Sequence, residues 1–122
     1  MNKDDIDLIN AHGTSTNLGD LSEGRAICRV FKHRAKKILV HSTKSMIGHL
    51  VGAGGGTEAI AGILALEKNI IHPTINQFEQ DPEIHINIVR NEPREKEVNN
   101  ILLNSFGFGG QNAVLVISKY KG

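Results

Sequence analysis

Three short segments of this sequence place chemistry-bearing side chains directly after apolar runs that are typical of strands. Residues 10–16 read Asn-Ala-His-Gly-Thr-Ser-Thr, and residues 42–49 carry Lys44 and His49 among small side chains. Residues 104–112 hold Phe106 and Phe108, two of only four phenylalanines in the chain, each beside glycine. Ligands bind at the carboxyl ends of strands in α/β sheets, so these segments are the candidates for a functional site.

The residue types in these segments suit chemistry on negative charge and on an apolar ligand. A cation beside a histidine lowers the pKa of the imidazole, which keeps the ring neutral and able to donate an N–H. Exposed phenylalanine in a glycine-rich loop suggests contact with an apolar ligand or partner. Simpler interpretations stay open: hydroxyls that cap a turn, a surface Lys44 with a capping His49, and phenylalanines folded back into the core.

Other motifs in the sequence do not indicate a site. The glycines of residues 52–56 lack both the dinucleotide fingerprint and the phosphate-loop pattern. Several glycines at the start of a helix cost ~1 kcal/mol each against alanine, so we expect close backbone packing against another element there. The six histidines show no zinc-ligand spacing. Cys28 lies beside an apolar helical stripe and is interpreted as a buried core residue, not a nucleophile.

Length and composition bound the class of protein. The 122 residues suit one domain, and 39% hydrophobic with 22% charged residues excludes a disordered tail or a fibre. A net charge of +1 argues against non-specific nucleic-acid binding. No apolar run is long enough for a membrane helix, and residues 1–7 do not resemble a signal segment. A single cysteine fits a reducing compartment.

The elements that must position these segments follow from apolar periodicity. Strands are predicted at residues 6–11, 38–41, 84–88, 101–105 and 113–118, the last two as a hairpin. One helix is predicted after Asp20 as N-cap, with Glu23 completing a capping box, and a second runs from the glycines to about Asn69. This order predicts a sheet with helices packed on it. Because the first strand reads as central yet begins almost at residue 1, we expect part of the sheet to lie outside this chain.

Residues 10–16, 44–49 and 104–110 together strongly resemble the β-ketoacyl-acyl-carrier-protein synthases, and most of all the synthase II type of fatty-acid elongation. The resemblance covers essentially the whole chain but only the C-terminal part of such an enzyme. It implies a thiolase-like α/β fold, with residues 1–122 as the C-terminal portion of a duplicated fold. The family's nucleophilic cysteine lies in the preceding half and has no match here, so the chain alone is expected to be inactive.

The resemblance also implies roles for individual residues. His12 and His49 match the two catalytic histidines, and Lys44 matches the active-site lysine. Glu58 matches a glutamate that pairs with this lysine or holds a structural monovalent cation. The remaining members of that cation site are expected to be Asn10 and Ser105. No metal and no cofactor are expected to take part in the reaction.

Substrate contacts are implied at two further places. Thr14 and Thr16 match the pair that hydrogen-bonds the carrier's pantetheine arm, and Phe108 matches a gatekeeper whose backbone N–H contributes to the oxyanion hole. Asn17 and Gln111 depart from residues common in the family, but neither position is catalytic.

The expected reaction is the decarboxylative condensation of an acyl-enzyme thioester with malonyl carrier protein. The implied partners are acyl carrier protein, the missing N-terminal half and a second copy in a homodimer, with neither nucleic acid nor membrane. The expected location is the cytoplasm, or an organelle matrix or stroma. Two alternatives remain: a ketosynthase domain of a polyketide synthase, and a non-catalytic thiolase-like subunit that binds carrier protein.

Overall fold

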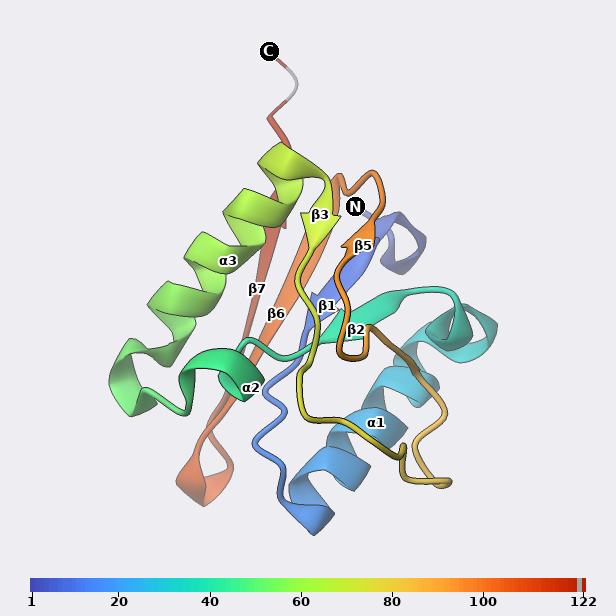
Figure 1. Cartoon of the computed structure of the whole chain (residues 1–122), viewed down its shortest axis with the longest axis vertical. Helices are drawn as coiled ribbons and strands as arrows, with labels where there is room; N and C mark the ends of the chain where they lie inside the picture. Colours follow the sequence, from blue (N-terminus) through green and yellow to red (C-terminus); the bar gives the residue numbers. More distant parts are fainter. Residues whose placement is uncertain (121) are drawn as a thin grey trace.

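The computed structural model describes residues 1–120 and 122, and within them five strands form one mixed sheet (Figure 1). The strand order is β4-β2-β1-β6-β7. Their bounds are β1 Leu8–Asn10, β2 Leu39–His41, β4 Asn87–Ile88, β6 Asn100–Phe106 and β7 Asn112–Ser118. All neighbours pair in parallel except β6 and β7, which form the predicted antiparallel hairpin. The predicted α/β class, a mixed sheet with helices packed on it, is confirmed.

Strand β1 is central, as predicted, because both of its faces are covered. Leu8 faces a core cluster that includes Leu66 of helix α3, and Ile9 faces a second cluster with Phe31 of helix α1. Both side chains are fully buried. The reason for expecting part of the sheet outside this chain does not hold at β1, because β2 and β6 of this chain supply both of its neighbours.

Helix α1 (Asn17–Phe31) lies on one face of the sheet, and its start differs from the prediction. Its N-cap is Thr16, so Asp20 lies inside the first turn and there is no capping box with Glu23. Asp20 instead accepts a hydrogen bond from the Ser15 N–H (3.2 Å). The capping box fails because buried backbone N–H groups of the preceding loop recruit the Glu23 carboxylate.

Helix α3 (Gly54–Lys68) covers the opposite face and ends at Asn69, which adopts a left-handed conformation with φ 54°. It follows the short helix α2 (Lys44–Ile47). The expected close packing of the glycines at its start is wrong within the described residues: a methyl group placed on Gly54 or Gly56 would meet no atom within 4 Å. The close approach occurs about two turns later, where a methyl on Gly62 would lie 3.7 Å from Ile101 and Leu103 of β6.

Residues 70–95 contain the other departure from the predicted order. A two-stranded antiparallel sheet, β3 (Ile70–Ile71) with β5 (Arg94–Glu95), was not predicted. The predicted strand over residues 84–88 shortens to β4. The Gln80 side-chain amide donates hydrogen bonds to the backbone carbonyls of Ile84 (2.6 Å) and Ile86 (3.1 Å), so these carbonyls are not paired in the sheet. Short 3-10 turns complete the chain: Lys3–Asp5, Lys32–Lys36, Val51–Ala53 and Phe108–Gly110.

Two smaller expectations concern the cysteine and membranes. Cys28 is half-buried against the α1-side core rather than fully enclosed, and its Sγ lies 3.6 Å from the His85 carbonyl oxygen. Within the described chain, none of the helices is both long and apolar enough to cross a membrane.

Candidate functional site

The candidate site lies where β1 and β2 end, together with the tip of the β6–β7 hairpin. His12 directly follows Ala11 at the end of β1, and His49 lies in the turn after α2. Their rings meet edge to face, with centroids 5.5 Å apart and planes at 88°. The structure therefore brings the two sequence-predicted histidines together.

Backbone donors define which ring nitrogen of each histidine carries the proton. The Phe106 N–H lies 3.3 Å from His12 Nδ1, and the Val51 N–H lies 3.1 Å from His49 Nδ1. A backbone N–H can only donate, so in the neutral imidazole each Nδ1 accepts and each Nε2 carries the hydrogen. Partial burial, and secondly the Lys44 charge, hold the pKa of His12 below its usual value. The site thus holds two imidazoles whose Nε2–H groups are free to donate.

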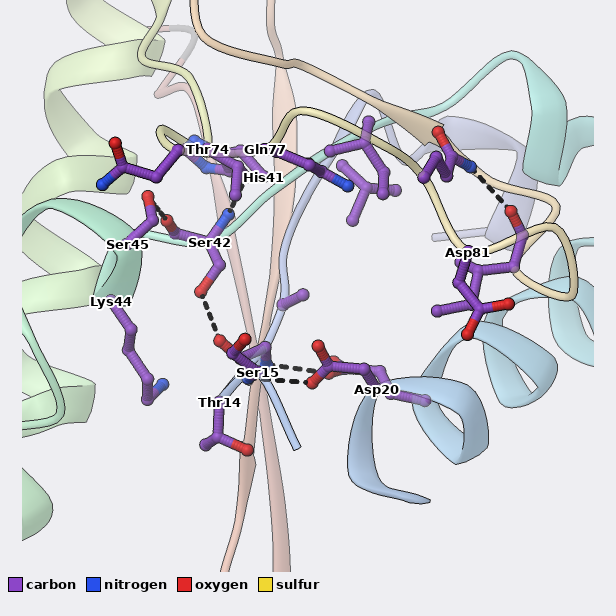
Figure 2. Close-up of a pocket in the computed structure, with 18 of the residues that line it drawn as sticks. Thr14, Ser15, Asp20, His41, Ser42, Lys44, Ser45, Thr74, Gln77 and Asp81 are labelled. Atoms are coloured by element: carbon purple, nitrogen blue, oxygen red, sulfur yellow. Dashed lines mark hydrogen bonds between the residues drawn. The ribbon is translucent and has the colours of Figure 1, made fainter. Parts of the chain in front are cut away.

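Lys44 and Glu58 form a buried ion pair next to these rings. Lys44 is the first residue of α2, Glu58 lies in the early turns of α3, and Lys44 Nζ donates to Glu58 Oε1. The two side chains are 7% and 2% exposed. A charge so poorly hydrated needs its partner, so this pair ties α2 to α3. In Figure 2 the Lys44 side chain extends from α2 toward the loop that carries Thr14.

The expected cation site at Asn10, Glu58 and Ser105 stays a prediction. The Asn10 amide is engaged with Thr43: its Nδ2 donates to Thr43 Oγ1 (2.7 Å) and its Oδ1 lies 3.4 Å from the Thr43 N–H. Glu58 Oε2 is buried without a hydrogen-bond partner among the described residues. Across residues 1–120 and 122, no group of three or more His, Cys, Asp or Glu side chains could hold a metal ion.

Glu23 is a site-forming residue whose role the sequence reasoning missed. Its carboxylate accepts from the backbone N–H groups of His12 and Gly13 (both 2.9 Å) and from Asn104 Nδ2 (2.9 Å). It is 6% exposed and links the His12 loop to β6. The signal in the sequence was its position four residues before Ile27, which places a carboxylate on the buried stripe of α1.

Thr14 and Thr16 lie at the entrance of a cavity of about 950 Å³. Their hydroxyl oxygens are 3.2 Å apart. The cavity lies between the His12 loop, α1, α2 and residues 74–81 (Figure 2). Lys44 and His49 line it as well, and aliphatic side chains contribute to its wall: Ile27, Val40, Ile75, Ile84, Ile86 and Ile88. Such a cavity, lined by many polar side chains beside an aliphatic wall, suits a ligand of mixed character.

The phenylalanines of the hairpin tip divide into two environments. Phe108 is fully exposed, so it is not a core residue. Gly109 and Gly110 take positive φ, 78° and 80°, which glycine adopts without strain, whereas Gly107 has φ −117°. Phe106, which the sequence indicated only as part of a loop that contacts an apolar ligand, is the one that touches the site: its ring centroid lies 5.5 Å from that of His12. The signal was that Phe106 continues the β6 strand, which ends beside β1.

Comparisons with known proteins agree on one family. The family profile described as "Beta-ketoacyl synthase, C-terminal domain" matches residues 1–78. The chain is 52% identical over 118 residues to 3-oxoacyl-[acyl-carrier-protein] synthase I, chloroplastic, of Hordeum vulgare. It is 48% identical over 117 residues to 3-oxoacyl-[acyl-carrier-protein] synthase 2 of Staphylococcus aureus (strain COL). These matches take in 97% and 96% of the chain but 25% and 28% of the relatives, so the chain spans about a quarter of their length.

Solved structures show the same likeness in three dimensions. The ishigamide ketosynthase/chain length factor superposes with a TM-score of 0.94 at 39% identity, over 99% of this chain and 30% of that one. A type II PKS ketosynthase, solved in complex with its acyl-carrier protein, gives a TM-score of 0.95 at 33% identity, over 98% and 29%. The sequence-based resemblance is thereby confirmed: the chain belongs to the beta-ketoacyl synthase family and carries that family's C-terminal domain.

Proposed function

We propose that this chain is the C-terminal part of a 3-oxoacyl-[acyl-carrier-protein] synthase, and that it supplies the decarboxylation half of the active site. The nucleophilic cysteine is supplied by an N-terminal half outside this chain. The reaction joins an acyl group, held as a thioester on that cysteine, to malonyl carrier protein. The products are a 3-oxoacyl carrier protein, carbon dioxide and the free thiol. The single observation that carries the proposal is the pair of Nε2–H donors on His12 and His49.

Loss of carbon dioxide from malonyl thioester leaves an electron pair that moves onto the thioester oxygen as an enolate. A site that holds hydrogen-bond donors at that oxygen before the reaction stabilises the developing charge without reorganising. Two imidazole Nε2–H groups from different loops can serve one oxygen, because the ring centroids lie 5.5 Å apart. The enolate carbon then attacks the acyl thioester, and the cysteine sulfur leaves.

Lys44 contributes through its charge rather than by direct proton transfer. Its ammonium is bound to Glu58 and lowers the pKa of His12, so it favours the neutral donor form of that ring. A protonated His12 would place a further cation beside Lys44, which burial makes costly. The Lys44 charge thereby adds to burial, the larger cause, in lowering the pKa of His12, and the Glu58 carboxylate offsets part of this effect.

Carrier protein is the proposed partner at the open side of the cavity. Thr14 and Thr16 offer hydroxyls at its entrance for the amides of a pantetheine arm. Phe108, on the flexible hairpin tip, is proposed as the gate for the acyl chain, and its backbone N–H as an oxyanion donor. The likeness to a type II PKS ketosynthase solved with its acyl-carrier protein supports this partner.

An exposed apolar face supports packing against an N-terminal half. Helix α3 exposes Ile60, Ile63 and Leu64, and β7 exposes Val114 and Leu115. Adjacent residues of a strand point to opposite faces, so β7 is apolar on both sides, as a strand buried in a larger assembly would be. We infer that residues 1–122 are one domain that packs against the N-terminal half of a homodimeric enzyme. We propose the cytoplasm, or an organelle matrix or stroma, as its location; one relative is named as chloroplastic and another is from a bacterium.

A polyketide ketosynthase is the second candidate, favoured by the structural likeness to a type II PKS. The higher identity to the two fatty-acid-type synthases supports the first. A non-catalytic subunit is disfavoured because His12, His49 and the Lys44–Glu58 pair are all present.

The proposal is tested in the complete enzyme by separating the two half-reactions. His12→Ala and His49→Ala should each lower malonyl carrier decarboxylation by about 10²–10³-fold, because each removes one donor to the enolate oxygen. Acyl transfer onto the cysteine should fall much less. Radiolabelled carbon dioxide release and acyl-enzyme formation measure the two steps.

His33→Ala, on an exposed 3-10 turn, is the matched control and should leave both steps unchanged. His12→Gln should recover part of the loss, since its amide can offer an N–H near the Nε2 position. Decarboxylation at the wild-type rate in either alanine variant would refute the assigned roles.

A further inference from the structure

We propose that His72 is a positioning residue for Lys44, acting through the Thr43 hydroxyl, in the reaction proposed above. His72 lies after β3, outside the three segments that resemble the family. Its Nε2 lies 3.0 Å from Thr43 Oγ1, and Thr43 immediately precedes Lys44 at the start of α2. Thr43 is 6% exposed, so its hydroxyl must find its partners within the protein.

The hydrogen bonds around Thr43 can be oriented in only one consistent way. The Thr43 N–H donates to Asn10 Oδ1, so Asn10 Nδ2 donates to Thr43 Oγ1 (2.7 Å). The Pro73 carbonyl can only accept, so His72 Nδ1 carries the hydrogen (3.0 Å) and Nε2 is the acceptor in the neutral ring. The Thr43 O–H therefore donates to His72 Nε2. His72 is the acceptor that directs this hydroxyl.

A second histidine, His41, holds His72 in place. His41 ends β2, and its Nδ1 lies 2.9 Å from the His72 carbonyl oxygen, so Nδ1 is the donor. The two rings pack with centroids 4.1 Å apart. His41 Nε2 is buried with no hydrogen-bond partner among the described residues, so a proton there would have no acceptor. The pair is consequently neutral, as burial, the largest cause, lowers the pKa of both rings.

This set of hydrogen bonds connects the loop that carries His12 to the helix that carries Lys44. Asn10 lies two residues before His12 on the end of β1, and Thr43 lies one residue before Lys44. Their mutual hydrogen bonds hold the two loops together, and His72 satisfies the last polar hydrogen of the set. Without that acceptor, the Thr43 hydroxyl would have to turn away from its present direction, and the start of α2 with it. Lys44 would then lose its fixed distance to the His12 ring.

The test uses the complete synthase and two variants that remove the same hydrogen bond from opposite sides. His72→Leu and Thr43→Val should each lower kcat for malonyl carrier decarboxylation by about 10- to 100-fold, with KM unchanged, because a displaced group costs rate and not binding. The double variant should show no further loss, since both changes delete one interaction. Amide hydrogen exchange of residues 44–48, followed by mass spectrometry, should speed up in all three.

Conservative variants separate positioning from general destabilisation. His72→Gln can present a carbonyl oxygen to the Thr43 hydroxyl, and Thr43→Ser keeps that hydroxyl, so both should retain most of the activity and slow exchange. His85→Leu, at an exposed histidine of the same segment, is the matched control. If His72→Leu fails to fold, the Thr43→Val and Thr43→Ser pair still decides the outcome.

Two results would overturn the inference: additive losses in the double variant, or unchanged kcat and exchange in Thr43→Val. If the unmodified synthase releases no carbon dioxide from malonyl carrier, the proposed function fails instead. The exchange of residues 44–48 then tests the His72–Thr43 link by itself.

Discussion

The end of the sheet that carries His12 and the outer face formed by α3 and β7 are built in opposite ways. At the first, most of the buried polar groups find partners within the chain: Glu23 bridges two loops, and Lys44 is paired with Glu58. At the second, large aliphatic side chains are open to solvent, and Ile60 of α3 is 61% exposed. Figure 1 shows α3 beside β7 at one side of the molecule and α1 at the other.

The difference indicates which parts of the proposed enzyme are autonomous. A buried polar site must be satisfied locally, since an unpaired buried group costs the full desolvation penalty. An apolar face can wait for another element, because hydrophobic contact is not directional. We therefore expect the polar site to be formed by this chain, and the apolar face to be completed by the N-terminal half.

The largest expected effect is the loss of unfolding free energy at acid pH that arises from His41. Burial lowers the pKa of His41 from 6.5 to about 3. The unfolded chain therefore binds a proton at this residue that the native state does not, once the pH falls below 6.5. The associated stability is fully present above pH 6.5 and declines by about 5 kcal/mol as the pH falls to 3.

Urea unfolding as a function of pH measures this term. His41→Asn keeps a donor near the Nδ1 position but cannot titrate, so its stability should fall less steeply between pH 6.5 and 3. His33→Asn, at an exposed site, should follow the wild-type slope. Equal slopes for His41→Asn and wild type would show that His41 is not buried as a neutral ring.

Next in size is the ion pair at the centre of the polar site. Glu58→Leu leaves the Lys44 ammonium buried without its partner, and breaking such a pair costs about 3–5 kcal/mol of unfolding free energy. Lys44→Met combined with Glu58→Leu should recover most of that loss, because two apolar side chains need no partner. Chemical unfolding of the two variants at neutral pH makes the comparison; equal stability of Glu58→Leu and wild type would contradict it.

Substitutions on the apolar face of α3 and β7 should change self-association and dye binding rather than stability. The chain by itself should self-associate or bind a hydrophobic dye, and Ile60→Lys with Val114→Lys should reduce both. Each exposed substitution should change the unfolding free energy by about 0.5 kcal/mol or less. Leu66→Ala, on the buried face of the same helix, should cost about 2–5 kcal/mol and serves as the contrast. A sharp monomer that binds no dye would argue against a covering partner.

The smallest stability effect is expected at the hairpin tip. Phe108→Ala removes a fully exposed ring and should change stability by about 0.5 kcal/mol or less, whereas Phe31→Ala in the core should cost about 3–5 kcal/mol. In the complete enzyme, Phe108→Ala should loosen the order in which substrates are accepted. Thermal unfolding beside condensation kinetics checks both. A large stability loss with normal kinetics would make Phe108 a packing residue.

Local patterns predicted the elements well where side chains report directly on burial. The Ile-rich run before His12 became the central strand, and the turn between β6 and β7 became the hairpin tip. Local patterns failed where a group distant in the sequence competes for the same hydrogen-bond partner. Asp20 and Glu23 had capping-box spacing, but buried N–H groups of the His12 loop claimed the Glu23 carboxylate. Gln80 likewise replaced ladder hydrogen bonds over residues 84–86.

The sequence by itself determined the α/β class, the family and the identities of His12, Lys44 and His49 as candidates. The class rests on apolar periodicity, and the family and the three candidates rest on the resemblance of short motifs; both are local properties of the chain. They needed no knowledge of which loops meet.

Only the tertiary structure decided how these residues are held. Parallel pairing of β1 with β2 and β6 brings three distant loops to one edge of the sheet. There the Phe106 N–H sets the tautomer of His12, and His72 accepts from Thr43. Such contacts join residues far apart in the chain, and hydrogen bonds act only at short range and in defined directions. No local pattern can therefore specify these contacts, and they arise only when the strands pair into the sheet.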